Sequence, residues 1–330
     1  MPGWVKISLI VLALLLPLEV ATGVWYWVTG QVIEQTNLWV AARRAEGITV
    51  SLGPASREGW PLQARIRMSP SSITSASRPG RATATLEAES ITVGVPLWKP
   101  NELHVGLYGT QRALWGGGRV LLFTSARTEL ILPLSSAQPP AEFDAVLDDL
   151  KFATPLVSMG MAKIQIHAGF AADHVAGSVS ADGIELAPTA LAAAIGETVE
   201  HASVELSVDG PLMASPAVWK AAGGKLHLTQ ATLTWGKLGV VARGEGELDD
   251  QLQPSGSLTA RVTGAADILD ALVAARMVTA NVANGTRTLF ALMQKPAPDG
   301  TATVELPFTL KNQRLQMGQF PVMRVPEATW

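Results

Sequence analysis

The sequence predicts a mainly β protein: a curved antiparallel meander, open and groove-like or a sandwich, with a few helices and one N-terminal transmembrane helix before it. Three observations predict this fold. A nearly unbroken apolar run covers residues 7–28, short segments of alternating apolar and polar residues fill most of the remainder, and glycine, proline and Asp-Gly pairs separate these segments. Short strands at hairpin spacing favour antiparallel over parallel pairing.

The apolar run within residues 1–30 is expected to be a membrane anchor. It carries one charged residue, Glu19. At about 1.5 Å per residue, a helix of this length would span the ~30 Å hydrocarbon core of a bilayer. Trp25, Tyr26 and Trp27 lie at its far end, where aromatic rings prefer the level of the lipid headgroups.

A cleaved secretory signal is the alternative for this segment. Lys6 supplies a positively charged start, and Ala21-Thr22-Gly23 resembles a small-x-small cleavage site. The run continues to Val28, which is longer than a signal core and favours the uncleaved anchor. The thin bias of positive residues predicts a single pass in a bacterial inner membrane, with the N-terminus cytoplasmic and the body periplasmic.

Composition limits the function classes. The 330 residues include no cysteine, carry a formal net charge of −3 and are only 16% charged. Disulfides and thiolate metal sites are therefore excluded, and no basic footprint for nucleic acid is present. A hydrophobic content of 48% predicts either a well-packed core or a second apolar surface reserved for a ligand.

Beyond the anchor, residues 31–47 are expected to form a juxtamembrane helix that ends at a glycine. Residues 48–138 are then an N-terminal β region and residues 139–330 a C-terminal one, divided at Gln138-Pro139-Pro140. Alternation is clearest from residue 62 to residue 69, where the apolar positions are Leu62, Ala64, Ile66 and Met68. Turns are expected at Asp182-Gly183, Asp209-Gly210, Gly223-Gly224, Pro254-Ser255-Gly256 and Asp299-Gly300.

Two stretches of the C-terminal region are expected to be helical. The Ala-rich residues 188–195 predict one short helix. Residues 267–294 predict two helical segments, interrupted near Asn284-Gly285, as an insertion that would cover an open sheet edge.

The sequence offers no motif for catalysis. None of the five histidines has a metal-binding spacing to another histidine or a carboxylate. His227 lies between Leu226 and Leu228, so alternation places it on the solvent face of its strand. We therefore expect no enzyme, no cofactor and no metal site.

Ten tryptophans against two tyrosines is an unusual ratio. Burial in the core is the first interpretation for those in the body, with a ligand-facing role for one or two as the alternative. These tryptophans are Trp60, Trp98, Trp115, Trp219 and Trp235.

Two short segments carry a family resemblance. Glu58-Gly59-Trp60-Pro61-Leu62 and Val95-Pro96-Leu97-Trp98-Lys99-Pro100-Asn101 resemble signatures of the bacterial envelope family that is number 2125 of the domains of unknown function. The C-terminal half also resembles AsmA-type proteins, through residues 244–258 and the final segment 307–321. The AsmA resemblance implies a role in phospholipid movement and envelope homeostasis.

Two functions follow as hypotheses. The first is an anchored protein that binds or helps transfer a lipid, either a phospholipid or another acyl-chain ligand, through the apolar side of a sheet that does not close. The second is an anchored scaffold or assembly factor that binds envelope proteins by strand addition; a periplasmic hydrolase or carbohydrate-binding domain comes third. The residues expected to line a lipid groove, or otherwise an ordinary packed core, are Val204, Leu206, Val208, Leu226, Leu228, Leu258, Val262, Leu306 and Phe308.

Overall fold

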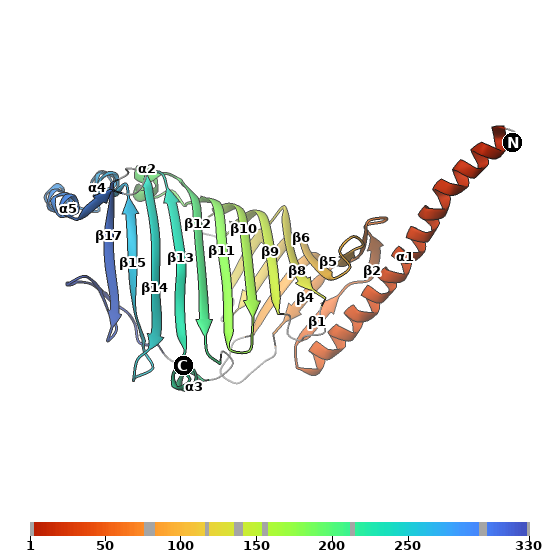
Figure 1. The fold of residues 1–330 in the computed structure, drawn as a ribbon, viewed down its shortest axis with the longest axis horizontal. Coiled ribbons are helices and arrows are strands. Elements are labelled where there is room, and N and C mark those ends of the chain that lie inside the picture. Colours follow the sequence, from red (N-terminus) through yellow and green to blue (C-terminus); the bar gives the residue numbers. More distant parts are fainter. Residues whose placement is uncertain are drawn as a thin grey trace. The chain divides into compact units, whose positions relative to one another are not determined.

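The computed structural model shows a mainly β chain (Figure 1). The chain divides into two compact units. Unit 1 comprises Met1–Leu147 with Phe152–Thr154, and unit 2 comprises Asp148–Lys151 with Pro155–Trp330. The boundary expected at residues 138–140 lies outside the described residues. The structure describes residues 3–75, 83–115, 119–134, 141–153, 158–211, 215–296 and 302–328.

Unit 1 begins with one long helix, α1 (Gly3–Ala45). The helix joins the expected anchor and the expected juxtamembrane helix without a break. The helix ends just before Gly47, as expected. Arg43 and Arg44 in its last turn favour this end, and Gly47 follows with a φ of 81°. Among the described residues, no helix is both long and apolar enough to cross a membrane. The side chains of residues 3–15 and of Pro17, which make up much of the apolar run, lie outside that description.

The β part of unit 1 is antiparallel in every described pairing. β5 pairs with both β3 and β4 along one side and with β6 along the other, and β6 also pairs with β7 and β8. The strands are β1 (Thr49–Leu52), β2 (Ala55–Glu58), β3 (Gln63–Met68), β4 (Ser71–Thr74), β5 (Ala84–Pro96), β6 (Glu102–Trp115), β7 (Arg119–Thr124), β8 (Arg127–Pro133) and β9 (Glu142–Ala153), of which β9 has residues in both units.

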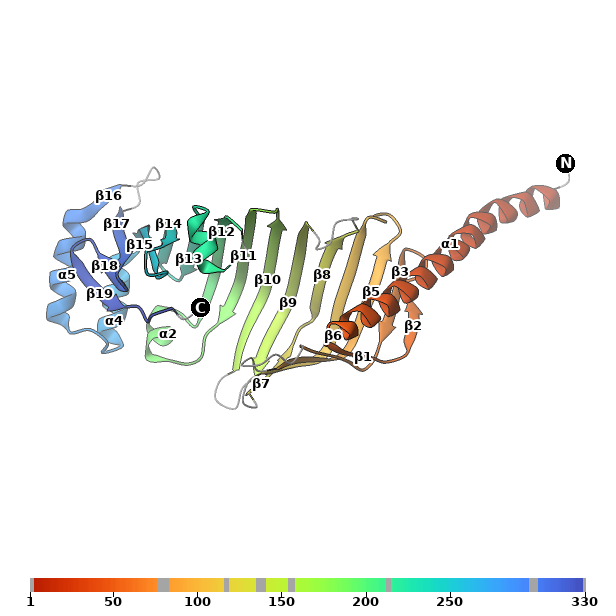
Figure 2. The same ribbon diagram turned by 90° about the horizontal axis from the view of Figure 1, so that it is seen from below.

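Helix α1 packs on this sheet through its C-terminal half (Figure 2). Val32 of the helix packs with Ile66 and Met68 of β3 and Val95 of β5. Burial of each such side chain contributes about 1.5–3 kcal/mol. The alternation expected in β3 is confirmed for its buried positions, but Leu62 is 65% exposed because the strand begins one residue later.

Unit 2 is a meander in which successive long strands pair antiparallel, from β10 to β15 and then to β17. The strands are β10 (Ser158–Phe170), β11 (His174–Glu185), β12 (Thr198–Asp209), β13 (Lys225–Trp235), β14 (Leu238–Leu248), β15 (Pro254–Thr263), β16 (Gln294–Pro296), β17 (Ala302–Lys311), β18 (Arg314–Met317) and β19 (Phe320–Arg324). The turn expected at Asp182-Gly183 is wrong: Gly183, with a φ of 60°, lies inside β11, where it interrupts the regular register with β10. Pro254–Gly256, also expected as a turn, begins β15.

Short helices occupy both ends of the unit 2 strands (Figure 1). α2 (Ala190–Ile195) contacts α4 (Ala265–Ala274), and α4 contacts α5 (Ala280–Met293), all at one end. α3 (Pro216–Ala221), which no pattern in the sequence predicts, connects β12 to β13 at the other end. Two helices in the insertion are confirmed, but the break falls at residues 275–279, where Arg276 has a φ of 56°, and not at Asn284-Gly285.

Candidate functional site

The two faces of the unit 2 sheet differ in polarity, and the strand register shows how. Paired residues in adjacent antiparallel strands project to the same face. One face therefore carries a continuous apolar row: Ala168, Gly177, Leu206, Leu228, Gly244, Leu258, Phe308 and Met317 are paired in succession. A parallel row consists of Phe170, Val175, Val208, Leu226, Gly246, Gly256, Leu310 and Leu315.

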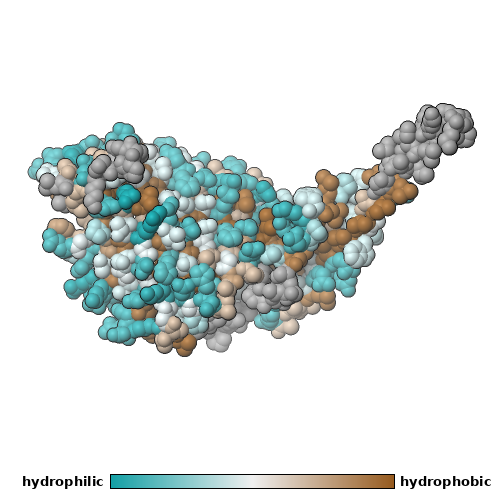
Figure 3. Space-filling model, in the orientation of Figure 1, coloured by the Kyte–Doolittle hydropathy of each residue, from teal (hydrophilic) through white to brown (hydrophobic). Residues whose placement is uncertain are grey.

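The opposite face is polar. Figure 3 shows mainly hydrophilic side chains over these strands on the side turned to the viewer. Ser203 pairs with Thr232, and Arg261 pairs with Glu305 at an Nη2–Oε1 distance of 2.8 Å. The alternation in the sequence thus resolves into one apolar and one polar face.

A cavity of about 680 Å³ lies on the apolar face at the end of the strands nearest α3. This volume falls within the range of roughly 300–1,000 Å³ that small-molecule sites commonly have. Five of the nine expected groove residues line it, namely Val208, Leu226, Leu228, Leu258 and Phe308.

The other four expected residues share this face but do not line the cavity. Val204 is 39% exposed on the open surface of β12, next to Leu206 in the alternation. Val262 pairs with Val304, which is fully buried, and Leu306 pairs with Ala260, nearer the end where α4 follows β15. The end of the face that bears α2, α4 and α5 is therefore packed, whereas the end nearest α3 is hollow.

Glycines create the hollow. Gly244, Gly246 and Gly256 lie on the apolar face of β14 and β15, between the leucines of β13 and the side chains of β17. Gly244 and Gly256 cannot carry a side chain, since a Cβ there would lie 2.4 Å and 2.3 Å from backbone oxygens of the facing strand. A Cβ at Gly246 would lie 3.6 Å from the Ser255 carbonyl oxygen, which is ordinary contact. Gly246 is therefore a position where a side chain could fill the cavity.

Helix α3 and the hairpin of β17 and β18 supply further walls. Pro216 and Trp219 reach the cavity from α3, and Leu310 and Leu315 from the hairpin. Trp219 packs on two glycines: a Cβ at Gly224 would lie 2.3 Å from its ring and one at Gly210 would lie 3.0 Å away. Its Nε1 is buried without a hydrogen-bond partner among the described residues. Sequence alternation in the long strands could not reveal the walls made by α3 and by Leu315 of β18, because these residues lie outside the long strands.

The C-terminal segment is fastened beside the cavity. Gln253, only 4% exposed, precedes the cavity residue Pro254. Its Oε1 accepts a hydrogen bond from the backbone N–H of Ala328 at 2.8 Å, and its Nε2 donates to the Ala328 carbonyl at 3.3 Å.

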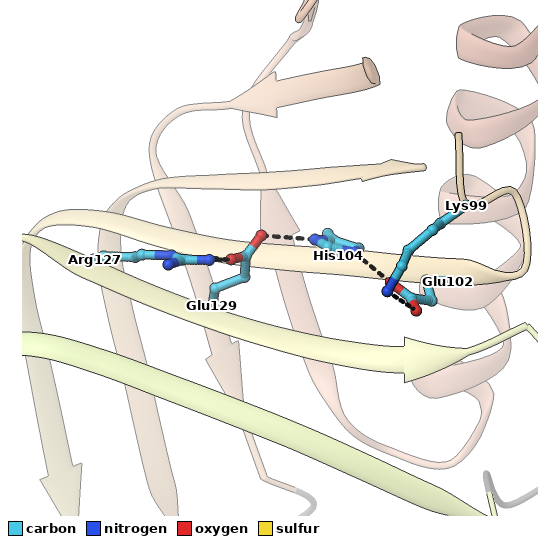
Figure 4. A network of polar contacts seen from close by, with 5 residues as sticks. All are labelled: Lys99, Glu102, His104, Arg127 and Glu129. Carbon is cyan, nitrogen blue, oxygen red and sulfur yellow. Dashed lines mark hydrogen bonds and ion pairs between the residues drawn. The ribbon is translucent and has the colours of Figure 1, made fainter. Parts of the chain in front are cut away.

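A polar network occupies the sheet of unit 1 (Figure 4). His104 on β6 lies between two carboxylates, with Nδ1 2.7 Å from Glu129 Oε1 and Nε2 3.2 Å from Glu102 Oε2. Lys99 donates to Glu102 at 2.9 Å, and Arg127 donates to Glu129 at 3.0 Å. Burial raises the pKa of Glu129, but the hydrogen bonds from Arg127 and His104 outweigh it and hold the pKa below its ordinary value. The Lys99 and His104 hydrogen bonds lower the pKa of Glu102.

A second network lies on the polar face of unit 2. His227 is on this face, as expected, with Nε2 3.2 Å from Asp209. His174 Nδ1 lies 2.6 Å from the same carboxylate and lowers the pKa of Asp209. Within the described part of the chain, no group of three or more histidine, cysteine or carboxylate side chains is arranged to hold a metal ion. These contacts join neighbouring strands, and a single sequence offers no signal for them.

The structure corrects the interpretation of the tryptophans as core residues. Trp60, Trp98 and Trp115 are between 41% and 62% exposed. Trp219 packs at the cavity, and Trp235 donates from Nε1 to the Gly196 carbonyl at 2.7 Å.

The fold and the cavity define a class of β-rich protein with one long helix and an antiparallel sheet that is apolar on one face. The chain belongs to the family described as "Uncharacterized protein conserved in bacteria (DUF2125)", whose model matches residues 25–326. No curated protein and no solved structure matches the chain. The family resemblance is thereby confirmed, and the AsmA resemblance of the C-terminal half stays a prediction.

Proposed function

We propose that this protein is an anchored periplasmic protein of the bacterial inner membrane that binds a lipid and helps transfer it, supporting envelope homeostasis. The observation that carries the proposal is the cavity on the apolar face of unit 2. Most of the residues that line it are apolar or glycine, and it is open, since Leu226 in its wall is 39% exposed. An open apolar cavity in a water-soluble sheet suits an acyl chain, which gains about 0.8 kcal/mol for each buried CH₂.

The membrane location in this proposal is supported by the sequence of α1. The apolar run of residues 7–28 has the length of a bilayer span and bears aromatic residues at its end. An anchor would hold the cavity close to a source of lipid. The binding itself needs no catalytic group, cofactor or metal.

Lipid content of the purified full-length chain tests the proposal. We expect native mass spectrometry of the protein in a mild detergent to show a bound phospholipid or other acyl-chain lipid. Gly246→Leu should fill the cavity and lower bound lipid about tenfold, which corresponds to ~1.4 kcal/mol. Val241→Leu on the polar face of the same strand is the matched control and should retain the lipid.

Two results would overturn lipid binding. One is wild-type protein that carries no lipid and does not shield a fluorescent fatty acid from water. The other is Gly246→Leu protein that is folded and binds as much lipid as the wild type.

One observation favours the scaffold function as a second candidate. β19 pairs with β18 in the described register, and its Phe320, Val322 and Met323 are each more than half exposed. An apolar strand of this kind can accept a strand from another chain. Cross-linking from Val322→Cys in cells tests it: a specific protein adduct would support strand addition, and its absence at native expression would count against it.

A further inference from the structure

Two loops of unit 1 carry exposed apolar side chains at one level along α1. Trp60 and Leu62 belong to the β2–β3 loop, and Trp98 belongs to the β5–β6 loop. We call these three residues the loop patch. They are between 48% and 65% exposed, in contrast to the core positions of β3 a few residues away.

Hydrogen bonds hold the loop patch together and fasten it to the helix. The Leu97 backbone N–H donates to the Leu62 carbonyl at 2.9 Å, so the two loops are adjacent. Trp60 Nε1 donates to Thr22 Oγ1 at 3.1 Å, and Trp25 Nε1 donates to the Gln63 carbonyl at 2.9 Å. The patch is thus fixed at residues 22–25 of α1.

The exposure of the α1 side chains changes at this level. Beyond it, Thr29 is fully buried and Val32 enters the core of unit 1. Val24 and Trp27, at the level of the patch, are exposed, and Figure 3 shows hydrophobic side chains where the described part of α1 runs along unit 1. The part of α1 before Thr22 is about 28 Å long at ~1.5 Å per residue, of which the apolar residues 7–21 account for about 22 Å, compared with the ~30 Å thickness of a hydrocarbon core.

Cations lie beside the aromatic side chains. Arg57 stacks over the ring of Tyr26 at 4.1 Å and donates to Thr29 Oγ1 at 3.1 Å. Lys99 follows Trp98 directly and is 57% exposed. Tryptophan together with Lys or Arg at the end of an apolar helix is the composition found at the headgroup level of membranes.

We propose that the loop patch is a membrane-interface contact, through which unit 1 rests on the headgroup region of the bilayer that holds α1. The partner of the loop patch in this contact is the lipid surface. The contact rests on the anchor of the proposed function and adds to it a second attachment, made by the β sheet itself. It places residues 22–27 at the interface, so the hydrocarbon-spanning part of the helix ends near Thr22 and not at Val28. Two attachments also fix the tilt of α1, and of unit 1 packed on it, against the membrane, which the helix alone would leave free.

The absence of native cysteine allows a direct test in the full chain. Leu62→Cys and Trp98→Cys are each labelled with the environment-sensitive fluorophore NBD. Val120→Cys in β7 is the control, because Val120 is also exposed but pairs with the far end of β6, about 40 Å along that strand from Glu102. The proteins are reconstituted into vesicles of phosphatidylethanolamine and phosphatidylglycerol, with or without bromine near the carbonyl end of the acyl chains.

We expect the brominated lipid to quench the labels at positions 62 and 98 about threefold more than the label at position 120. Flotation of the vesicles reports the anchor separately. Protein that floats without quenching at either position would overturn the patch and leave the anchor standing. Protein that does not float would overturn both. A label shielded from water but not quenched would show a protein partner in place of the bilayer and would also overturn the proposal.

Discussion

Leu228 on β13 lies directly opposite Gly244 on β14, and Gly244 lies opposite Leu258 on β15. Two large apolar side chains thus flank a position that has no side chain. One pair further on, two leucines flank two adjacent glycines, since Leu226 faces Gly246, Gly246 faces Gly256 and Gly256 faces Leu310. The cavity follows from this register, because the glycine backbone of β14 and β15 forms its base and side chains of the neighbouring strands form its walls.

A charge introduced at the cavity should separate binding from folding. Leu228→Glu would direct a carboxylate into an open apolar site, so lipid binding should be lost while the free energy of unfolding falls by only about 1 kcal/mol. Val304→Glu on the same face is the contrasting variant. Val304 is 1% exposed, and an unpaired buried charge should cost more than ~4 kcal/mol. Urea unfolding with bound-lipid measurement checks both, and comparable unfolding by the two variants would show that Leu228 is ordinary core.

Part of this site could be predicted from the sequence. Strict alternation at Val204, Leu206 and Val208 correctly placed one face of β12. The hollow could not be predicted in this way, since it depends on which residues are paired across strands. An irregularity between Glu205 and Leu206 shifts the register with β13, and this shift brings Leu228 opposite Leu206.

The other differences from expectation also have local causes. Leu62 matches the alternation of β3 but precedes the strand, and it is exposed in a loop. Asn284 and Gly285 are weak helix formers that nevertheless lie inside α5, where the neighbouring Ala283 is fully buried and tertiary packing of the helix overrides propensity. α3 is only six residues long, too short to produce a helical period in the sequence.

Gly224 should tolerate no side chain. In Gly224→Ala the new methyl group would lie 2.3 Å from the Trp219 ring, and overpacking of this kind costs about 1–3 kcal/mol. Gly285→Ala is the matched control: its Cβ meets nothing within 4 Å inside α5, so stability should rise by about 0.5–1 kcal/mol. Thermal unfolding measures both changes, and equal stability of the two variants would refute the packing of Trp219 on Gly224.

Acid should weaken unit 1 through Glu129. The folded-state pKa of this carboxyl lies below its ordinary value, so the charged form is the one that folding stabilises. That contribution is fully present above the ordinary glutamate pKa of about 4.3 and is lost as the pH falls through the lower folded-state value. Glu129→Gln should therefore reduce the free energy of unfolding by about 1 kcal/mol at pH 7. It should also weaken the fall of this free energy with decreasing pH.

The control for this pH dependence is Glu87→Gln. Glu87 is 41% exposed and contacts an exposed Arg112 at 3.3 Å, and exposed pairs of this kind contribute little. Urea unfolding of each variant between pH 3 and pH 7 supplies the comparison. If the wild type and Glu129→Gln lost stability in parallel on acidification, the hydrogen bonds to Glu129 would not be the cause.

Gln253 should determine whether the C-terminal segment stays fastened beside the cavity. Gln253→Ala removes both hydrogen bonds to Ala328, each worth about 0.5–1.5 kcal/mol net. Residues 325–328 should then be trimmed faster by carboxypeptidase, while the rest of unit 2 keeps its thermal unfolding temperature. Gln230→Ala is the control, because Gln230 accepts from Arg243 at 3.1 Å on the polar face and does not contact Ala328. Gln253, which binds the C-terminal segment, lies next to Pro254 in the cavity wall. Faster trimming accompanied by faster release of lipid would therefore show that the segment also retains the ligand.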